Sequence, residues 1–160
     1  MIVHPISPVF DDNSEILILG SFPSVKSREQ GFFYGHPQNR FWRVTAEVFA
    51  CPVPSSVEEK RAFLLQNHIA LWDVIASCDI DGSADSTIRD AVPNDLTVIL
   101  SAAPIRRIYV NGKTAERYFK RYIEPIIHRK AACLPSTSPA NAAWSLASLV
   151  DVWKQLRTSD

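Results

Sequence analysis

Three short segments carry residue types from which a binding or catalytic site can be built. The first consists of Gly20, Ser21, Phe22, Pro23 and Ser24, directly after a continuous apolar run. A glycine at the end of a buried strand lets the backbone turn sharply and brings amide groups close to a ligand. The same residues would also serve an ordinary turn from a strand into a helix. The segment is not a phosphate-binding loop, because the pattern Gly-x-x-x-x-Gly-Lys is absent from the chain.

The second segment places three consecutive aromatic residues close to a histidine and an amide. Phe32, Phe33 and Tyr34 stand in a loop between two glycines and can offer a flat apolar face on which a nucleobase would stack. Asn39 is either part of the same site or simply the cap of the helix that follows. His36 is either a further contact or a loop histidine bonded to the backbone.

The third segment is rich in hydroxyl groups and runs from residue 134 to 141. Ser136, Thr137 and Ser138, with backbone amides at the start of a helix, would suit a phosphate oxygen. Plain helix capping by Ser138 is the alternative. Pro139 and Asn141 complete the segment and are candidates to fill or brace the space that an everted nucleotide leaves in a duplex.

Other hydrolase chemistries find no support in the sequence. No Gly-x-Ser-x-Gly motif marks a serine nucleophile, and no obvious pair of carboxylates marks a standard glycosidase. The four histidines lack metal-ligand spacing, so we expect neither a metal nor another cofactor. Cys51, Cys78 and Cys133 form no Cys-x-x-Cys pair and are expected to be reduced packing residues. Four polar residues are further candidates to contribute near the predicted site, although each is more simply a loop or capping residue: Asp73, Asp85, Ser86 and Arg89.

These segments must be positioned by a sheet, and the apolar runs predict one. We expect strands over residues 15–20, 69–75, 105–110 and 131–134. We expect helices over residues 40–49, 56–67, about 94–103, 114–122 and from the third segment to 156, with a polar loop over 79–90. Strands alternating with helices predict an α/β fold with a parallel sheet covered on both faces. Ligands bind beyond the carboxyl ends of such strands, so the loops to inspect follow Gly20, Val110 and Leu134. Phe41 and Trp42 are expected in the core.

Composition sets the remaining bounds. A chain of 160 residues with 46% hydrophobic residues is expected to form a single domain over residues 1–160. No apolar stretch suits a membrane span and the N-terminus does not read as a secretory signal, so we expect a cytoplasmic protein, near the nucleoid in a prokaryote. Seventeen basic and seventeen acidic residues argue against a broad basic surface that coats nucleic acid. Local contacts to a few phosphates remain compatible with this balance.

The order and spacing of the three segments resemble those of the uracil-DNA glycosylase superfamily. Gly20-x-x-Pro23 and the run from His36 to Trp42 look like its mismatch-specific branch. Ser21-Phe-Pro-Ser24, Tyr34-Gly35 and the third segment look more narrowly like its hypoxanthine-DNA (deoxyinosine) glycosylase family. The resemblance covers about Glu15 to Trp153 and implies a three-layer α/β/α sandwich with a central four-stranded parallel sheet. It also implies base excision repair on double-stranded DNA that contains a deaminated base.

Two departures from the superfamily pattern bear on the chemistry. The mismatch-specific branch places a water-orienting Asn where this chain has Phe22, which speaks against ordinary uracil excision. The hypoxanthine family likewise lacks that Asn, and its important amides match Asn39 and Asn111 here. The usual third-loop His or Asn falls at Ser136. Some relatives hold an iron-sulfur cluster on four cysteines, which three dispersed cysteines do not support.

The resemblance thus implies a monofunctional, monomeric glycosylase in which Asn39 positions water and Asn111 donates to the departing base. Gly20 to Ser24, Tyr34 and His36 would bind the base, and Ser136 to Asn141 the DNA. Three alternatives stay open at this point. They are a lyase that uses Lys113 or Lys26 as an amine nucleophile, a non-catalytic module that senses distorted or mismatched DNA, and a nucleotide-binding protein unrelated to DNA.

Overall fold

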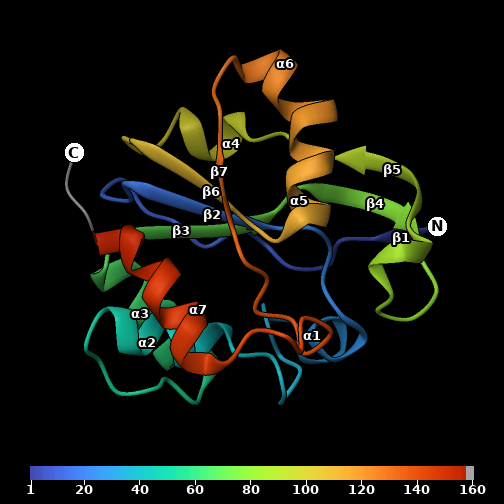
Figure 1. The fold of residues 1–160 in the computed structure, drawn as a ribbon. Helices are drawn as coiled ribbons and strands as arrows, with labels where there is room; N and C mark the ends of the chain where they lie inside the picture. The colour runs from blue at the N-terminus through green and yellow to red at the C-terminus, as the bar shows by residue number, and fades with distance from the viewer. Residues whose placement is uncertain (158–160) are drawn as a thin grey trace.

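A central parallel sheet organises the fold (Figure 1). The structure is a computed structural model, and it describes residues 1–157. The sheet has the strand order β3-β2-β6-β7, and all its neighbouring strands are parallel. The strands are β2 (Ile16–Gly20), β3 (Ile69–Asp73), β6 (Arg107–Asn111) and β7 (Ala132–Leu134). The α/β sandwich with a four-stranded parallel sheet is therefore confirmed.

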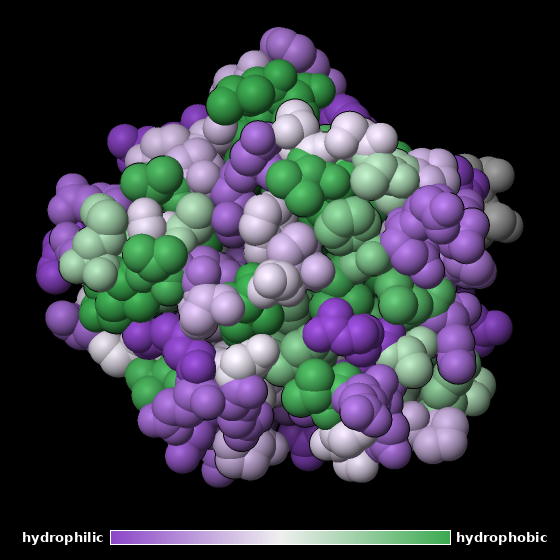
Figure 2. All heavy atoms as spheres, turned by 180° about the vertical axis from the view of Figure 1, so that it is seen from behind, coloured by the Kyte–Doolittle hydropathy of each residue, from purple (hydrophilic) through white to green (hydrophobic). Residues whose placement is uncertain are grey.

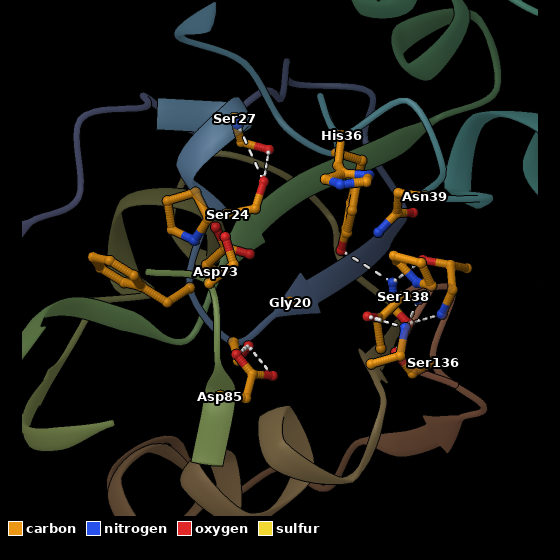
Figure 3. A pocket seen from close by; sticks show the side chains of 18 of the residues that line it. Gly20, Ser24, Ser27, His36, Asn39, Asp73, Asp85, Ser136 and Ser138 are labelled. Atoms are coloured by element: carbon orange, nitrogen blue, oxygen red, sulfur yellow. Dashed lines mark hydrogen bonds between the residues drawn. The ribbon is translucent and has the colours of Figure 1, made fainter. Parts of the chain in front are cut away.

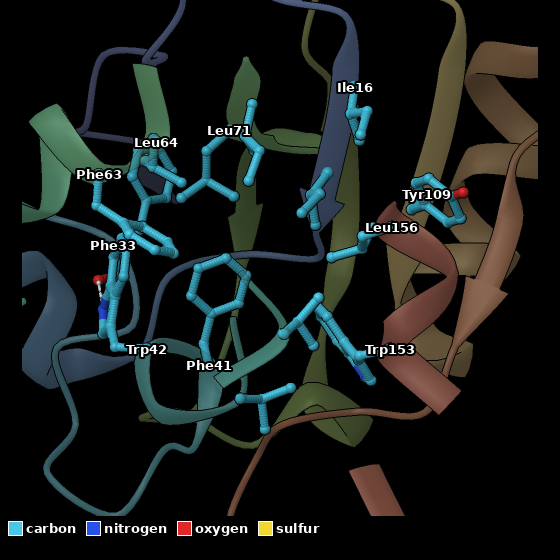
Figure 4. Close-up of a cluster of buried hydrophobic side chains, with 14 of the residues drawn as sticks. Ile16, Phe33, Phe41, Trp42, Phe63, Leu64, Leu71, Tyr109, Trp153 and Leu156 are labelled. Carbon is cyan, nitrogen blue, oxygen red and sulfur yellow. Dashed lines mark hydrogen bonds between the residues drawn. The ribbon is translucent and has the colours of Figure 1, made fainter. Parts of the chain in front are cut away.

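Each face of the sheet is covered by its own helices, because alternate side chains of a strand point to opposite faces. Ile16 and Ile18 of β2 pack in a cluster with α2 (Phe41–Val48), α3 (Val57–Gln66) and α7 (Leu146–Trp153), which Figure 4 shows. Leu17 and Leu19 pack on the other face, in a cluster that includes residues of α4 (Thr97–Leu100) and α5 (Lys113–Tyr118). Phe41 and Trp42 lie in the core, as expected.

A second, antiparallel sheet was not expected from the sequence. Its strand order is β1-β4-β5, with β1 (Ile2–Val3), β4 (Ile75–Asp79) and β5 (Arg89–Pro93). The predicted polar loop over 79–90 holds for residues 80–88, which include a short 3-10 turn, η1 (Asp85–Thr87), but its ends are wrong because Asp79 belongs to β4 and Arg89 and Asp90 to β5. Their polar, irregularly paired residues hide the two-residue alternation by which strands are recognised.

Several predicted boundaries also shift. The apolar run 69–75 is divided, because β3 ends at Asp73 and Ile75 already belongs to β4. An unpredicted helix, α1 (Val25–Gln30), follows Ser24, which caps it. The helix expected over 94–103 is the single turn of α4, and α5 continues through a π-helical segment, Phe119–Ile123, into α6 (Glu124–Ile127). A 3-10 turn, Lys154–Arg157, ends the described chain.

The surface mixes hydrophobic and hydrophilic residues. Figure 2 shows separate apolar patches among polar ones, with one patch at the top of the molecule, where α6 lies in Figure 1. Within residues 1–157, none of the helices has the length and apolar character that a bilayer crossing requires. Cys78 is fully buried, while Cys51 and Cys133 are half-buried and packed against the two clusters; all three are free thiols, in keeping with the predicted packing role.

Candidate functional site

A pocket of about 590 Å³ opens at the carboxyl ends of β2, β3 and β6 (Figure 3). Its volume lies within the range of about 300–1,000 Å³ that is typical of small-ligand sites. All predicted site residues except Asn141 line it: Gly20, Ser21, Phe22, Pro23, Ser24, Tyr34, His36, Asn39, Asn111, Ser136, Thr137, Ser138 and Pro139. The first two segments, which only α1 separates, thus meet Asn111 and the third segment, about a hundred residues later in the chain. Gly20, Asn111 and the third segment come together because parallel strands end at the same edge of the sheet.

Gly20 forms the floor of the pocket, where no side chain would fit. A Cβ atom at this position would lie 2.4 Å from Oδ1 of Asp73 and 2.9 Å from the hydroxyl of Tyr34. The backbone N–H groups of Ser21 and Phe22 donate no hydrogen bond to any residue within 1–157, although both residues line the pocket. The turn after β2 therefore offers free amide donors at the bottom of the site.

The aromatic segment divides its three residues between the core and the pocket. Phe32 and Phe33 are 2% exposed and belong to the hydrophobic cluster under the sheet, so the expected three-residue stacking face is wrong. Phe33 still contributes to the pocket lining. Tyr34 turns the other way because its backbone takes a φ of 52°, a left-handed conformation that bulky residues rarely adopt. Such strain is common at functional sites.

Tyr34 is held on its ring face and at its hydroxyl. Its ring stacks on that of Phe41 with centroids 4.1 Å apart and an interplanar angle of 12°. Its hydroxyl accepts a hydrogen bond of 3.2 Å from Nδ2 of Asn111. Burial, and to a smaller extent the charge of Asp73, raises the pKa of Tyr34 well above its ordinary value. The hydroxyl therefore stays protonated and keeps an O–H group to donate.

Asn111, the last residue of β6, links the second segment to the third. Its Nδ2 donates to Tyr34 and, over 3.0 Å, to Oγ1 of Thr137, while its Oδ1 accepts the backbone N–H of Thr137 over 3.1 Å. Both N–H bonds of the carboxamide are thus engaged within the protein. The predicted role of Asn111 as a direct donor to a ligand would require it to release one of them.

Asn39 and His36 each combine a pocket position with a bond to the local backbone. Oδ1 of Asn39 accepts the N–H of Phe41 over 2.9 Å, so the capping alternative is also realised. Nδ1 of His36 accepts the N–H of Gln38 over 3.1 Å. These bonds fix the orientation of both side chains at the rim, and a carbonyl oxygen retains a second lone pair for another donor.

The third segment is a fixed loop, not the start of a helix. The last helix, α7, begins only at Leu146 and is capped by Ser145, so the expected helix-start amides and capping by Ser138 are wrong. Arg40 holds the loop with guanidinium bonds to the carbonyls of Ser138, Asn141 and Trp144. Asn141 does not line the pocket, and its Nδ2 donates to the carbonyl of Ser136 over 2.9 Å. The hydroxyls of this loop nevertheless line the pocket.

The acidic side of the pocket is formed by Asp73 and Asp85, for which the sequence favoured a loop or capping role over a place in the site. Figure 3 shows Asp73 and Asp85 on one side of Gly20, with Asn39, Ser136 and Ser138 on the other. The simpler reading of Asp73 as a loop residue is wrong, because it is the buried last residue of β3. The signal was present: a carboxyl group at the carboxyl end of a strand. It was obscured because the strand was expected to continue to Ile75.

Asp85 reaches the pocket from η1 and accepts the hydroxyl of Ser21 at 3.1 and 3.3 Å. Burial raises the pKa of the Asp85 carboxyl, and the Ser21 bond opposes part of this shift. The turn that carries Asp85 is attached to α1, since the N–H of Val25 donates to Oγ of Ser83 and Arg28 donates to the carbonyl of Gly82. The loop that joins β4 to β5 thus supplies one wall of the pocket.

Comparisons with known proteins agree with this geometry. The family model described as the uracil DNA glycosylase superfamily matches residues 7–157. The chain is 37% identical over 150 residues to a protein of Methanosarcina acetivorans named hypoxanthine DNA glycosylase, covering 91% of this chain and 92% of that one. It is 34% identical over 153 residues to a protein of the same name from Methanosarcina barkeri, covering 92% and 93%.

A solved structure is similar over the whole chain. The solution NMR structure of a Methanosarcina acetivorans protein, described as a candidate uracil DNA glycosylase, superimposes with a TM-score of 0.81 and 34% sequence identity. The match covers 99% of this chain and 100% of that one. Sequence and structure comparisons therefore point to the same family.

Proposed function

This chain belongs to the uracil DNA glycosylase superfamily, and we propose that the base it removes from DNA is hypoxanthine. It is a DNA glycosylase, an enzyme that hydrolyses the bond between a base and its deoxyribose. The relatives named hypoxanthine DNA glycosylase support the substrate. The carrying observation is the Tyr34 ring, fixed by Phe41 and Asn111 in a pocket that Asn39 also lines.

Base flipping explains why a mispaired deaminated base would be selected. Extrusion of a nucleotide costs a few kcal/mol, and least where the base is poorly paired. The everted base would lie against Tyr34 in the pocket, while the loop at Ser136 to Pro139 would face the DNA backbone. Asn141 would act on the DNA only through the loop that it holds, because its amide is bonded to Ser136.

Cleavage needs groups that stabilise the departing base as negative charge builds on it. Deaminated bases leave more readily than adenine or cytosine because their ring amide stabilises an anion. The free N–H groups of Ser21 and Phe22 and the O–H of Tyr34 are the donors available for this purpose. Asn111 then acts as a positioning residue, since its amide orients the Tyr34 hydroxyl instead of contacting the base.

Asn39 is proposed to place the attacking water. A carboxamide is a poor proton acceptor, so its contribution is to hold water in line with C1′, while the Phe41 N–H holds the carboxamide. The water oxygen bonds to C1′ as the N-glycosidic bond breaks, the electron pair leaves with the base, and a proton from water neutralises the base. The products are free hypoxanthine and an abasic site.

Uracil is proposed as a poorer substrate. Phe22 stands where the mismatch-specific branch carries its water-orienting Asn, and it is packed edge-on against His4 with centroids 5.8 Å apart. An amine nucleophile is not favoured, because neither Lys26 nor Lys113 lines the pocket. We further propose that residues 1–160 act as one domain and as a monomer in the cytoplasm, associated with the nucleoid if the source is a prokaryote.

The test is a panel of duplex oligonucleotides with one hypoxanthine, uracil or xanthine opposite each normal base, followed by hot alkali to reveal abasic sites. We expect hypoxanthine strands to be cut fastest and borohydride to trap no adduct. Asn39→Ala should lower the single-turnover rate by about a hundredfold or more, because water is no longer positioned. Asn13→Ala, an exposed change of the same kind, is the control. A folded Asn39→Ala protein with the wild-type rate would overturn the assignment.

A further inference from the structure

A buried histidine–aspartate pair lies beneath the pocket and has no part in the chemistry described above. Nε2 of His4 and Oδ2 of Asp73 are 2.7 Å apart, and their side chains are 3% and 5% exposed. Nδ1 of His4 accepts the N–H of Ile6 over 3.2 Å, so the ring proton is on Nε2 and is donated to Asp73. A residue directly after β1 thereby fixes the rotation of a carboxylate at the end of β3.

The second oxygen of this carboxylate faces the pocket without a partner. Oδ1 of Asp73 accepts no hydrogen bond from any residue within 1–157, and Asp73 lines the pocket. Oδ1 lies against Gly20, as does the hydroxyl of Tyr34, which brings it to the pocket floor. The Asp73 side chain is 5% exposed and lines the pocket, so the unpaired Oδ1 is held in place and is open to a donor on a ligand.

We propose that Oδ1 of Asp73 accepts the ring N–H of the everted base, and that His4 is the positioning residue that holds it there. This inference rests on the proposed function and adds which group of the base the enzyme recognises, the N–H at ring position N1. Deamination of adenine changes N1 from a hydrogen-bond acceptor to an N–H donor. A fixed carboxylate oxygen therefore pairs with hypoxanthine and repels the N1 lone pair of adenine, which would leave two buried acceptors unpaired.

The hydrogen bond between Asp73 and the base is expected to favour hypoxanthine over adenine when the base binds, before the glycosidic bond is cleaved. Negative charge builds on the base as it leaves, and a carboxylate contact does not strengthen toward that state. Loss of the contact should therefore change the affinity for the lesion more than the cleavage rate at saturating enzyme. Asp85, the other carboxyl of the pocket, is already bonded by Ser21, so its oxygens are less available to the base.

Asp73→Asn gives a directional test because His4 decides how the new amide points. The Nε2–H of His4 would pair with the amide oxygen, and the amide NH2 would then face the pocket. This group donates to N1 of adenine and clashes with the N1–H of hypoxanthine. The preference for hypoxanthine should therefore fall about ten- to hundredfold, the usual effect of losing one charge-assisted hydrogen bond.

Affinity would be measured on duplexes in which 2′-fluorination blocks cleavage, with hypoxanthine or adenine opposite a tetrahydrofuran spacer so that base pairing contributes nothing. The expected result is a fall in the hypoxanthine-to-adenine affinity ratio for Asp73→Asn and for His4→Ala. His4→Gln, whose amide can still donate to Asp73, should restore part of it. Asp95→Asn, at an exposed residue whose carboxylate accepts the N–H of Thr97, is the control for carboxyl removal.

Unchanged ratios in folded Asp73→Asn, or a fall in Asp85→Asn alone, would overturn the inference. The melting temperature of each variant separates these outcomes from misfolding, and the ratio is a property that a purely structural role would not alter. Failure of the proposed function is a different result, since the wild-type enzyme would then release no hypoxanthine from cleavable duplexes.

Discussion

The ring of Tyr34 lies parallel to the ring of Phe41, with centroids 4.1 Å apart, although one residue stands in a strained loop and the other begins α2. The loop is held in this conformation by two further bonds. The indole of Trp42 donates to the carbonyl of Phe33, and the N–H of Gly35 donates to Oγ of Ser27. The core of α2 thus sets the position of the stacking residue before any ligand arrives.

Tyr34→Phe is predicted to keep the stack and lose the donor. The single-turnover rate should fall about a hundredfold, which is the effect of removing one donor aimed at a developing anion. The loss should also appear in Asn111→Ala, because Asn111 acts through Tyr34. The double variant is then expected to be about as slow as the slower single variant, since the two effects are not independent.

Tyr122→Phe is the matched control, as Tyr122 lies outside the pocket. If the rate loss of the double variant equals the product of the two single losses, Asn111 contacts the base directly. The positioning role assigned to its carboxamide would then have to be abandoned.

Gly20→Ala is predicted to abolish activity. The added Cβ would approach Oδ1 of Asp73 to 2.4 Å and the Tyr34 hydroxyl to 2.9 Å, so both groups must shift from the pocket floor. The lesion affinity and the melting temperature should both fall. Gly82→Ala is a useful comparison, because an added Cβ at that site would meet no atom within 4 Å. The backbone φ of 59°, which an alanine rarely adopts, is then the source of strain. Its cost should be limited to about 1–2 kcal/mol of stability.

Asp85→Asn is predicted to stabilise the fold at neutral pH. Burial raises the pKa of Asp85 in the folded state, so the folded protein favours the protonated form. The contribution of Asp85 to stability is therefore complete below the unfolded pKa of about 3.9 and is lost as the pH rises through the raised folded value. An uncharged Asn avoids this loss and can still accept the Ser21 hydroxyl.

Urea unfolding of both proteins between pH 4 and pH 8 measures the difference. The variant should gain stability relative to wild type as the pH rises and should match it toward pH 4. A constant difference over the whole range would exclude a titration of Asp85 as its cause.

Arg40→Lys is predicted to loosen the third segment. The planar guanidinium of Arg40 donates to three carbonyl groups of the loop. The ammonium group of a lysine lacks this planar set of donors and cannot bond to all three in the same way. Affinity for duplex DNA should decrease, and amide hydrogen exchange over residues 136–144 should become faster. Arg43→Lys, at an exposed position of the same helix, should leave both measurements unchanged.

Local sequence patterns predicted the four strands of the parallel sheet and the three segments that build the site. Continuous apolar runs such as Ile16–Leu19 require burial on both faces, which only a covered parallel sheet provides. That sheet brings Gly20 and Asn111 to one edge, and so a site there was predictable from local patterns alone. The order of the motifs was enough to indicate the family.

The direction of individual side chains was decided only by the tertiary structure. Phe32, Phe33 and Tyr34 are alike as residue types, but packing against α2 places the first two in the core and a left-handed backbone turns the third toward the pocket. The pairing of His4 with Asp73 joins residues 69 positions apart through an antiparallel sheet whose strands show no clear pattern. Such long-range contacts depend on the whole packed fold, because no local preference specifies them.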